Sequence, residues 1–189
     1  MSNSDCSQKT VSEGSACSLQ SPVSSCCPGP GGSRICPEGE SYVKKITTPK
    51  IAVMACEGAC IKGEIARVAA NILAYQLERN SAVRICLGDA ATGKSGFLDL
   101  MQQAPKILAI EGCFLRCGNE IMKMRVPSFT STIIEASSLY SYDKERIFEI
   151  FDMPRTEIEE IAQKIAENIQ QKFFNDENQG NTSCCSSPK

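Results

Sequence analysis

The chain has 189 residues and a formal net charge of −2, which allows one folded domain with its own core and gives no indication of a nucleic-acid partner or of membrane insertion. No apolar run approaches the ~20 residues that a membrane-spanning helix needs, and the first residues lack the pattern of a secretory signal. The twelve cysteines are therefore expected to be reduced thiols in the cytoplasm, suited to metal binding or redox chemistry. The absence of histidine excludes imidazole ligands and a histidine base.

Both ends of the chain have a composition typical of unfolded segments. Residues 1–45 are rich in Ser, Gly and Pro, and residues 176–189 are polar, so we predict that both are disordered on either side of a folded domain at residues 46–175. Their thiols either have no fixed role or capture soft metals and metalloids. These thiols belong to Cys6, Cys17, Cys26, Cys27, Cys36, Cys184 and Cys185.

Between the two ends, apolar runs that predict strands alternate with stretches of helical periodicity. We predict strands at residues 51–55, 82–87, 107–110 and 132–135. Helices are predicted at residues 62–78, 96–103, from about 117 to before 127, 143–151 and 156–174, the last opening with a capping box at Thr156 and Glu159. This alternation predicts an α/β fold with a parallel β-sheet flanked by helices, Rossmann-like or doubly wound.

Five cysteines fall at or just after the ends of predicted strands, namely Cys56, Cys60, Cys86, Cys113 and Cys117. Because sites in such sheets form at the carboxyl ends of the strands, we expect the five thiols to converge on one edge. Four thiolates bind zinc tetrahedrally or hold an iron–sulfur cluster, and paired thiols cycle to a disulfide. Buried cysteines that act only as small apolar side chains are the simplest alternative. We favour zinc, because both pairs have the spacing CxxxC rather than the CxxC of thioredoxin-like centres.

A competing motif follows the second predicted strand. Residues 88–95, GDAATGKS, satisfy the phosphate-binding pattern GxxxxGK[ST]. Under this alternative, Gly88, Gly93 and Lys94 would bind the phosphates of ATP or GTP, and Ser95 would ligate Mg²⁺. The cysteine at the strand end belongs to the thiol pattern, so both interpretations remain open.

The segments ACEGAC, ICLGDAATGKSGFL and ILAIEGCFLRC resemble the DGC-domain family, which is inferred to bind zinc through four cysteines. The resemblance implies Cys56, Cys86, Cys113 and Cys117 as ligands, with Cys60 as an additional thiol. Glu111 stands where the family has Asp. The expected role is metal or metalloid handling, or thiol homeostasis, rather than catalysis. The expected partners are a metal ion or soft metalloid and a thioredoxin-like or metal-transfer protein.

Overall fold

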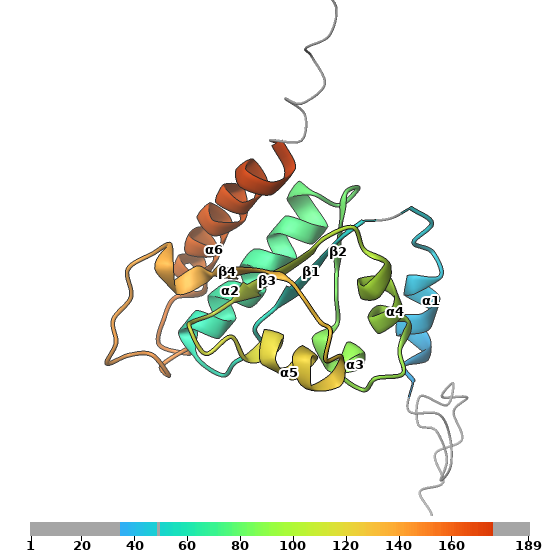
Figure 1. Cartoon of the computed structure of the whole chain (residues 1–189). Coiled ribbons are helices and arrows are strands. Elements are labelled where there is room, and N and C mark those ends of the chain that lie inside the picture. Colours follow the sequence, from blue (N-terminus) through green and yellow to red (C-terminus); the bar gives the residue numbers. More distant parts are fainter. Residues whose placement is uncertain (1–34, 49, 176–189) are drawn as a thin grey trace, which may run out of the picture. The chain divides into compact units, whose positions relative to one another are not determined.

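The computed structural model describes residues 35–48 and 50–175, and a four-stranded parallel sheet runs through this part of the chain (Figure 1). The strand order is β2-β1-β3-β4, and every neighbouring pair is parallel. The strands are β1 Ile51–Ala55, β2 Ala82–Arg84, β3 Ile107–Glu111 and β4 Thr132–Glu135. The predicted α/β fold is confirmed.

Helices cover both faces of the sheet (Figure 1). The α-helices are α1 Pro37–Val43, α2 Ile61–Ile72, α3 Leu87–Ala90, α4 Gly96–Gln103, α5 Cys117–Arg125 and α6 Arg155–Gln170. Three short elements complete the set: the π-helices η1 Leu73–Leu77 and η3 Gln171–Asn175, and the 3-10 helix η2 Ala136–Ser138. Within the described residues, no helix is long and apolar enough to cross a membrane.

The central strands are apolar apart from Glu111 at the end of β3, because both of their faces are buried. Val53 and Leu108 point into a core shared with α2 and α6. Met54 and Ala109 point into a second core, shared with α3, α4 and α5. A strand alternates its side chains between the two faces of a sheet, so each face receives its own apolar set.

Two predicted elements differ from the structure. The strand predicted for residues 82–87 ends at Arg84, because α3 already begins at Leu87. Residues 143–151 form turns instead of a helix. The Ile147 carbonyl accepts a hydrogen bond from the Ile61 N–H at the start of α2, and the Phe148 and Phe151 side chains are exposed, so no apolar stripe faces the core.

The start of α6 also differs from its prediction. Pro154 occupies the N-cap position and no side chain caps the helix, so the predicted capping box is wrong. Thr156 lies inside the first turn. The side chain of the first helical residue, Arg155, instead forms ion pairs with Glu159 in α6 and with Glu64 in α2.

Helix α1 lies inside the segment that was predicted to be disordered, residues 1–45, so that prediction is wrong for this stretch. Cys36 caps the helix, with its sulfur accepting the Gly39 N–H at 3.3 Å. The Tyr42 ring stacks on Phe97 in α4, with 5.8 Å between centroids. Composition cannot reveal such tertiary contacts. The remaining residues predicted as disordered tails, 1–34 and 176–189, lie outside the described part of the chain.

A carboxylate of α1 also binds the start of α4, where Glu40 Oε1 accepts the Gly96 N–H at 2.5 Å. We predict that Glu40→Ala lowers the free energy of unfolding by about 1 kcal/mol, the usual effect of losing an acceptor at a helix N-terminus. Urea denaturation measures the change. Glu160→Ala, at an exposed position of α6, is the matched control. Equal stabilities for the two variants would contradict the role of Glu40.

Candidate thiol site

The loops that follow β1 and β3 meet where the chain order of the sheet reverses. From β1 the chain crosses to β2 on one side, and from β3 it crosses to β4 on the other. Ligand sites of parallel sheets form at such a point, beyond the carboxyl ends of the strands. The two loops carry Cys56, Cys60 and Cys113, and Cys117 begins the helix that follows the second loop.

Two glycines allow these loops to approach the first turn of α2. A Cβ on Gly112 would lie 2.8 Å from the Gly63 nitrogen and 2.9 Å from the Lys62 carbonyl oxygen. A Cβ on Gly63 would lie 2.5 Å from the Gly58 carbonyl oxygen. Real Cβ atoms do not approach backbone so closely, so only glycine fits at both positions. The approach brings Cys113, next to Gly112, to the start of α2, which Cys60 precedes.

Cys56 is the most buried of the five predicted ligands, with 5% of its surface exposed. Its sulfur accepts the Gly58 N–H at 3.3 Å. Burial raises the pKa of the Cys56 thiol, and the backbone N–H groups of Gly112 and Gly58 partly offset that rise. Glu111 and Cys117 lie close enough to add to it electrostatically. Burial therefore favours the neutral form of the Cys56 thiol.

Cys60 and Cys113 are half-buried and share a neighbour. Cys60 is the N-cap residue of α2, and its side chain does not cap the helix. Both thiols act electrostatically on the phenol of Tyr140, which belongs to the segment after η2. This segment follows β4, so sequence analysis of the cysteine motifs did not find Tyr140.

Cys86 and Cys117 are exposed. Cys86 lies between β2 and α3, and it borders a cavity of about 310 Å³ whose lining includes Arg67, Tyr75 and Arg84. Cys117 is the first residue of α5. Exposed side chains can change rotamer without disturbing a packed core, so these two thiols can turn toward an ion from solvent.

The structure therefore places all five predicted ligands near the ends of β1, β2 and β3, in different neighbourhoods. Cys56 lies near Cys117, while Cys60 and Cys113 lie near Tyr140. Among the residues that the structure describes, no three Cys, Asp or Glu side chains are close enough together to hold a metal ion. The five-cysteine ligand set thus stays a prediction. Its donors are all sulfur, which suits zinc and other soft ions.

A buried carboxylate fixes the second loop. Glu111, the last residue of β3, is fully buried and accepts hydrogen bonds from the N–H groups of Asn119 at 2.6 Å and Gly118 at 3.3 Å. These amides belong to the first turn of α5, where a negative charge also complements the helix dipole. Burial raises the pKa of Glu111, and the two amide hydrogen bonds partly offset that rise. Glu111 therefore sets how α5, and with it Cys117, meets the end of β3.

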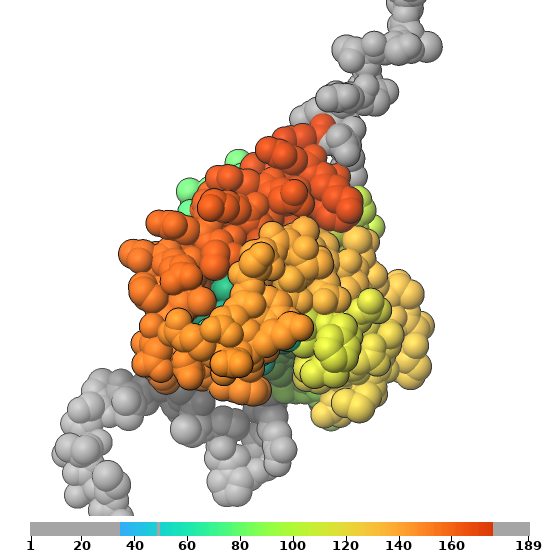
Figure 2. All heavy atoms as spheres, turned by 90° about the vertical axis from the view of Figure 1, so that its left-hand side faces the viewer, coloured from blue at the N-terminus to red at the C-terminus, as the bar shows by residue number. Residues whose placement is uncertain are grey.

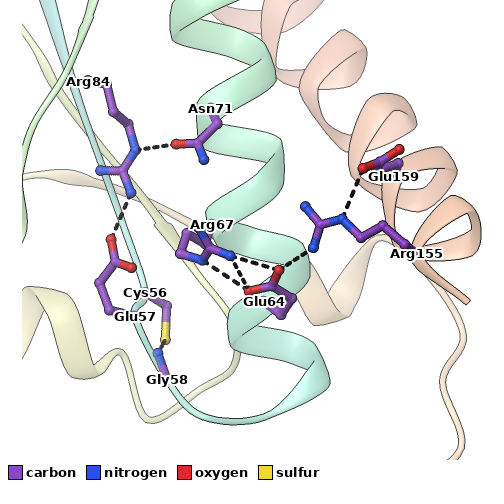
Figure 3. Close-up of polar contacts among 9 residues, drawn as sticks. All are labelled: Cys56, Glu57, Gly58, Glu64, Arg67, Asn71, Arg84, Arg155 and Glu159. Carbon is purple, nitrogen blue, oxygen red and sulfur yellow. Dashed lines mark hydrogen bonds and ion pairs between the residues drawn. The ribbon is translucent and has the colours of Figure 1, made fainter. Parts of the chain in front are cut away.

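A buried arginine connects the loop after β1 with the end of β2 (Figure 3). Arg84 is only 7% exposed; its Nη2 lies 2.8 Å from Glu57 Oε1, and its Nε donates to Asn71 Oδ1 at 3.0 Å. Its Nη1 donates to the Ile85 carbonyl. Glu57 follows Cys56 directly, so this ion pair fixes the backbone next to that thiol. An arginine inside a predicted strand was the only signal of this role in the sequence.

A second polar network connects α2 with α6 (Figure 3). Glu64, in the first turn of α2, accepts hydrogen bonds from Arg67 and from Arg155, and Arg155 also pairs with Glu159. Burial acts to raise the pKa of Glu64, but the hydrogen bonds from the two arginines lower it overall. The network thus holds the end of α2 that carries Cys60 against the start of α6.

The phosphate-binding motif does not form a phosphate loop. Gly88 lies inside α3, and the N–H groups of residues 90–93 donate to carbonyl oxygens of residues 86–90. A phosphate loop needs such N–H groups pointing at the ligand, and here they are used within the chain. The predicted phosphate contacts of Gly88 and Gly93 are therefore not supported.

The last residues of the motif are also engaged. Ser95 is 4% exposed and caps α4, with its hydroxyl oxygen accepting the Leu98 N–H at 3.3 Å. The Gly96 N–H, which an anion at this helix start would use, donates to Glu40. Lys94 is exposed. The nucleotide alternative, with Lys94 and Ser95 as phosphate and Mg²⁺ contacts, is not favoured.

We predict that Glu111→Ala lowers the free energy of unfolding by about 2 kcal/mol or more, because two buried amides lose their acceptor. Glu111→Gln keeps an acceptor oxygen and is expected to lose less. Denaturant titration measures both. Glu120→Ala, in the same turn of α5 but exposed, is the matched control. Similar losses for Glu111→Ala and Glu120→Ala would show that the buried carboxylate does not hold α5.

For the competing motif, we expect no saturable binding of ATP or GTP at millimolar concentration with Mg²⁺, because the loop amides and the start of α4 already have partners. Isothermal titration calorimetry measures this. Nucleotide binding that disappears in Lys94→Ala would show that residues 88–95 do bind phosphates.

A model of the DGC domain matches residues 52–165, from β1 into α6. Neither the curated proteins nor the solved structures that were compared contain a match to this chain. The matched region holds all four cysteines that the resemblance implied as ligands, and it covers more than half of the chain. The chain therefore belongs to the DGC domain family.

Proposed function

We propose that this protein binds zinc through thiolates at the carboxyl ends of β1, β2 and β3, and that it holds or transfers the metal rather than catalysing a reaction. The proposed ligands are Cys56, Cys86, Cys113 and Cys117, with Cys60 as a fifth thiol for exchange. Four thiolates complete the tetrahedral shell of zinc, so no position is left open for a substrate.

One observation carries this function, namely the approach of Gly112 to the first turn of α2. Without it, the Cys56–Cys60 loop and the Cys113–Cys117 loop would follow adjacent strands and then diverge. With it, Cys113 is brought to the start of α2, which Cys60 precedes. Small apolar cysteines would need no such arrangement, because a core residue packs equally well away from a strand end.

The protonation of the thiols fits metal capture. Burial raises the pKa of Cys56, so this thiol is neutral before an ion arrives. Zinc binding requires the thiolate and so releases the proton. The exposed thiols Cys86 and Cys117 give an ion or metalloid a path from solvent. A thioredoxin-like or metal-transfer protein in the cytoplasm is the partner we expect for exchange at such a site.

We predict about one zinc per chain and a colourless protein after anaerobic purification. Serine substitution of Cys56, Cys86, Cys113 or Cys117 should each remove most of the zinc and lower the melting temperature, because structural zinc adds its binding free energy to folding. Cys60→Ser should keep zinc but release it more slowly to a chelator. Elemental analysis and thermal denaturation measure these effects.

Cys26→Ser and Cys184→Ser, outside the matched domain, are the controls and should keep full zinc content. Unchanged zinc in both Cys113→Ser and Cys117→Ser would refute the site. Loss of zinc in Cys60→Ser but not in Cys86→Ser would mean that Cys60, and not Cys86, is the fourth ligand. A brown protein with bound iron would show that the site holds an iron–sulfur cluster instead of zinc.

A further inference from the structure

Two segments carry the most exposed large apolar side chains of the described residues. One segment, residues 113–125, is the end of the loop after β3 together with α5, and the other, residues 143–152, follows β4. Five of their side chains have 60% or more of their surface exposed, namely Phe114, Leu115, Met124, Phe148 and Phe151. Single exposed apolar residues are common on protein surfaces, but a group of them on two segments indicates a contact surface.

The two segments meet at the first turn of α2. The Ile147 carbonyl, in the second segment, accepts a hydrogen bond from the Ile61 N–H at 2.9 Å. Gly112, directly before the first segment, approaches the same turn so closely that a Cβ there would lie 2.9 Å from the Lys62 carbonyl oxygen. In Figure 2, residues 143–152, in orange, and the yellow-green to yellow residues from the end of β3 into α5 form neighbouring parts of one surface. We call this surface, residues 113–125 and 143–152, the apolar face.

The two halves of the apolar face have opposite net charges. Residues 113–125 contain three basic residues and one acidic residue, a net charge of +2. Residues 143–152 contain four acidic and two basic residues, a net charge of −2. A two-fold rotation places the positive half of one copy on the negative half of another, so the face is electrostatically complementary to itself.

We propose that the apolar face is a dimer interface, on which a second copy of this chain docks by two-fold symmetry. Residues 113–125 of each copy contact residues 143–152 of the other, so that Phe114 and Leu115 are removed from water together with Phe148 and Phe151. A partner of a single charge would match only one half of the face, which favours a second copy as the occupant. The dimer does not depend on metal binding.

Sedimentation equilibrium of the full chain over a range of concentrations measures the dimer dissociation constant. A reductant is present, because disulfides among the twelve cysteines would also join two chains. We expect a reversible dimer. Phe148→Ser combined with Phe151→Ser should raise the dissociation constant about tenfold or more, the usual effect of removing aromatic anchors. Tyr75→Ser, which removes an exposed aromatic side chain of η1 outside the apolar face, is the matched control and should leave the constant unchanged.

A charge exchange tests the pairing of the two halves. Lys123→Glu with Arg125→Glu makes both halves negative, and Glu145→Lys with Asp152→Lys makes both halves positive; all four side chains are exposed. Each variant alone should be monomeric where the unmodified protein is a dimer, because like charges then meet in both contacts. An equimolar mixture should form a heterodimer, because opposite charges meet again.

Three results would overturn the proposal. The unmodified protein could be monomeric at its highest soluble concentration, which would leave the apolar face to a different kind of partner. A dimer that none of these substitutions weakens would use another surface. A mixture of the two charge variants that stays monomeric would show that the two halves do not face each other. The proposed metal site would stand in all three cases, because zinc content is measured separately.

Discussion

The contact between Gly112 and the first turn of α2 is the constraint on which the candidate site depends. A Cβ at position 112 would lie 2.8 Å from the Gly63 nitrogen, so there is no room for any side chain there. Cys113 follows this glycine directly, and Cys60 and Ile61 begin the helix turn that it touches. The positions of both thiols are thus set by a backbone contact rather than by their own side chains. Any residue larger than glycine at position 112 would separate the two loops and disperse the site.

Two buried charged groups hold the same loops from outside the contact. Glu111 binds amides of α5, and Arg84 binds Glu57 and the carbonyl of Ile85. Each of them lies two residues before a predicted ligand, Glu111 before Cys113 and Arg84 before Cys86. Burying a charge is unfavourable unless it is paired, so each of them favours the single loop conformation in which its partners are in reach. The thiols are consequently presented by a rigid frame, although Cys86 and Cys117 themselves are exposed.

The sequence was most informative where one periodicity dominates. The continuous apolar runs of β1 and β3 predicted strands with two buried faces, and the strand ends then located the cysteines. The sequence-based predictions failed where tertiary contacts determine the local structure. The short helix α1 depends on Phe97 and on the start of α4, and residues 143–151 use their backbone to bind Ile61. The prediction of a phosphate loop at residues 88–95 failed because the N–H groups of residues 90–93 donate hydrogen bonds to nearby carbonyl oxygens in and after α3. Tyr140 comes from a segment with no recognisable pattern, so its place beside the thiols could not be predicted.

The five thiols differ in exposure, and this bears on whether the proposed metal is fixed or transferred. Cys56 is buried, Cys60 and Cys113 are half-buried, and Cys86 and Cys117 are exposed. A purely structural zinc is best protected when all of its ligands are buried, because no competing thiol can then reach the ion. With two exposed ligands, a partner thiol can replace one sulfur at a time while the buried ligand still holds the metal. This gradient fits the proposed exchange better than a permanently enclosed ion, and the proposed role of the fifth thiol is that of the intermediate ligand.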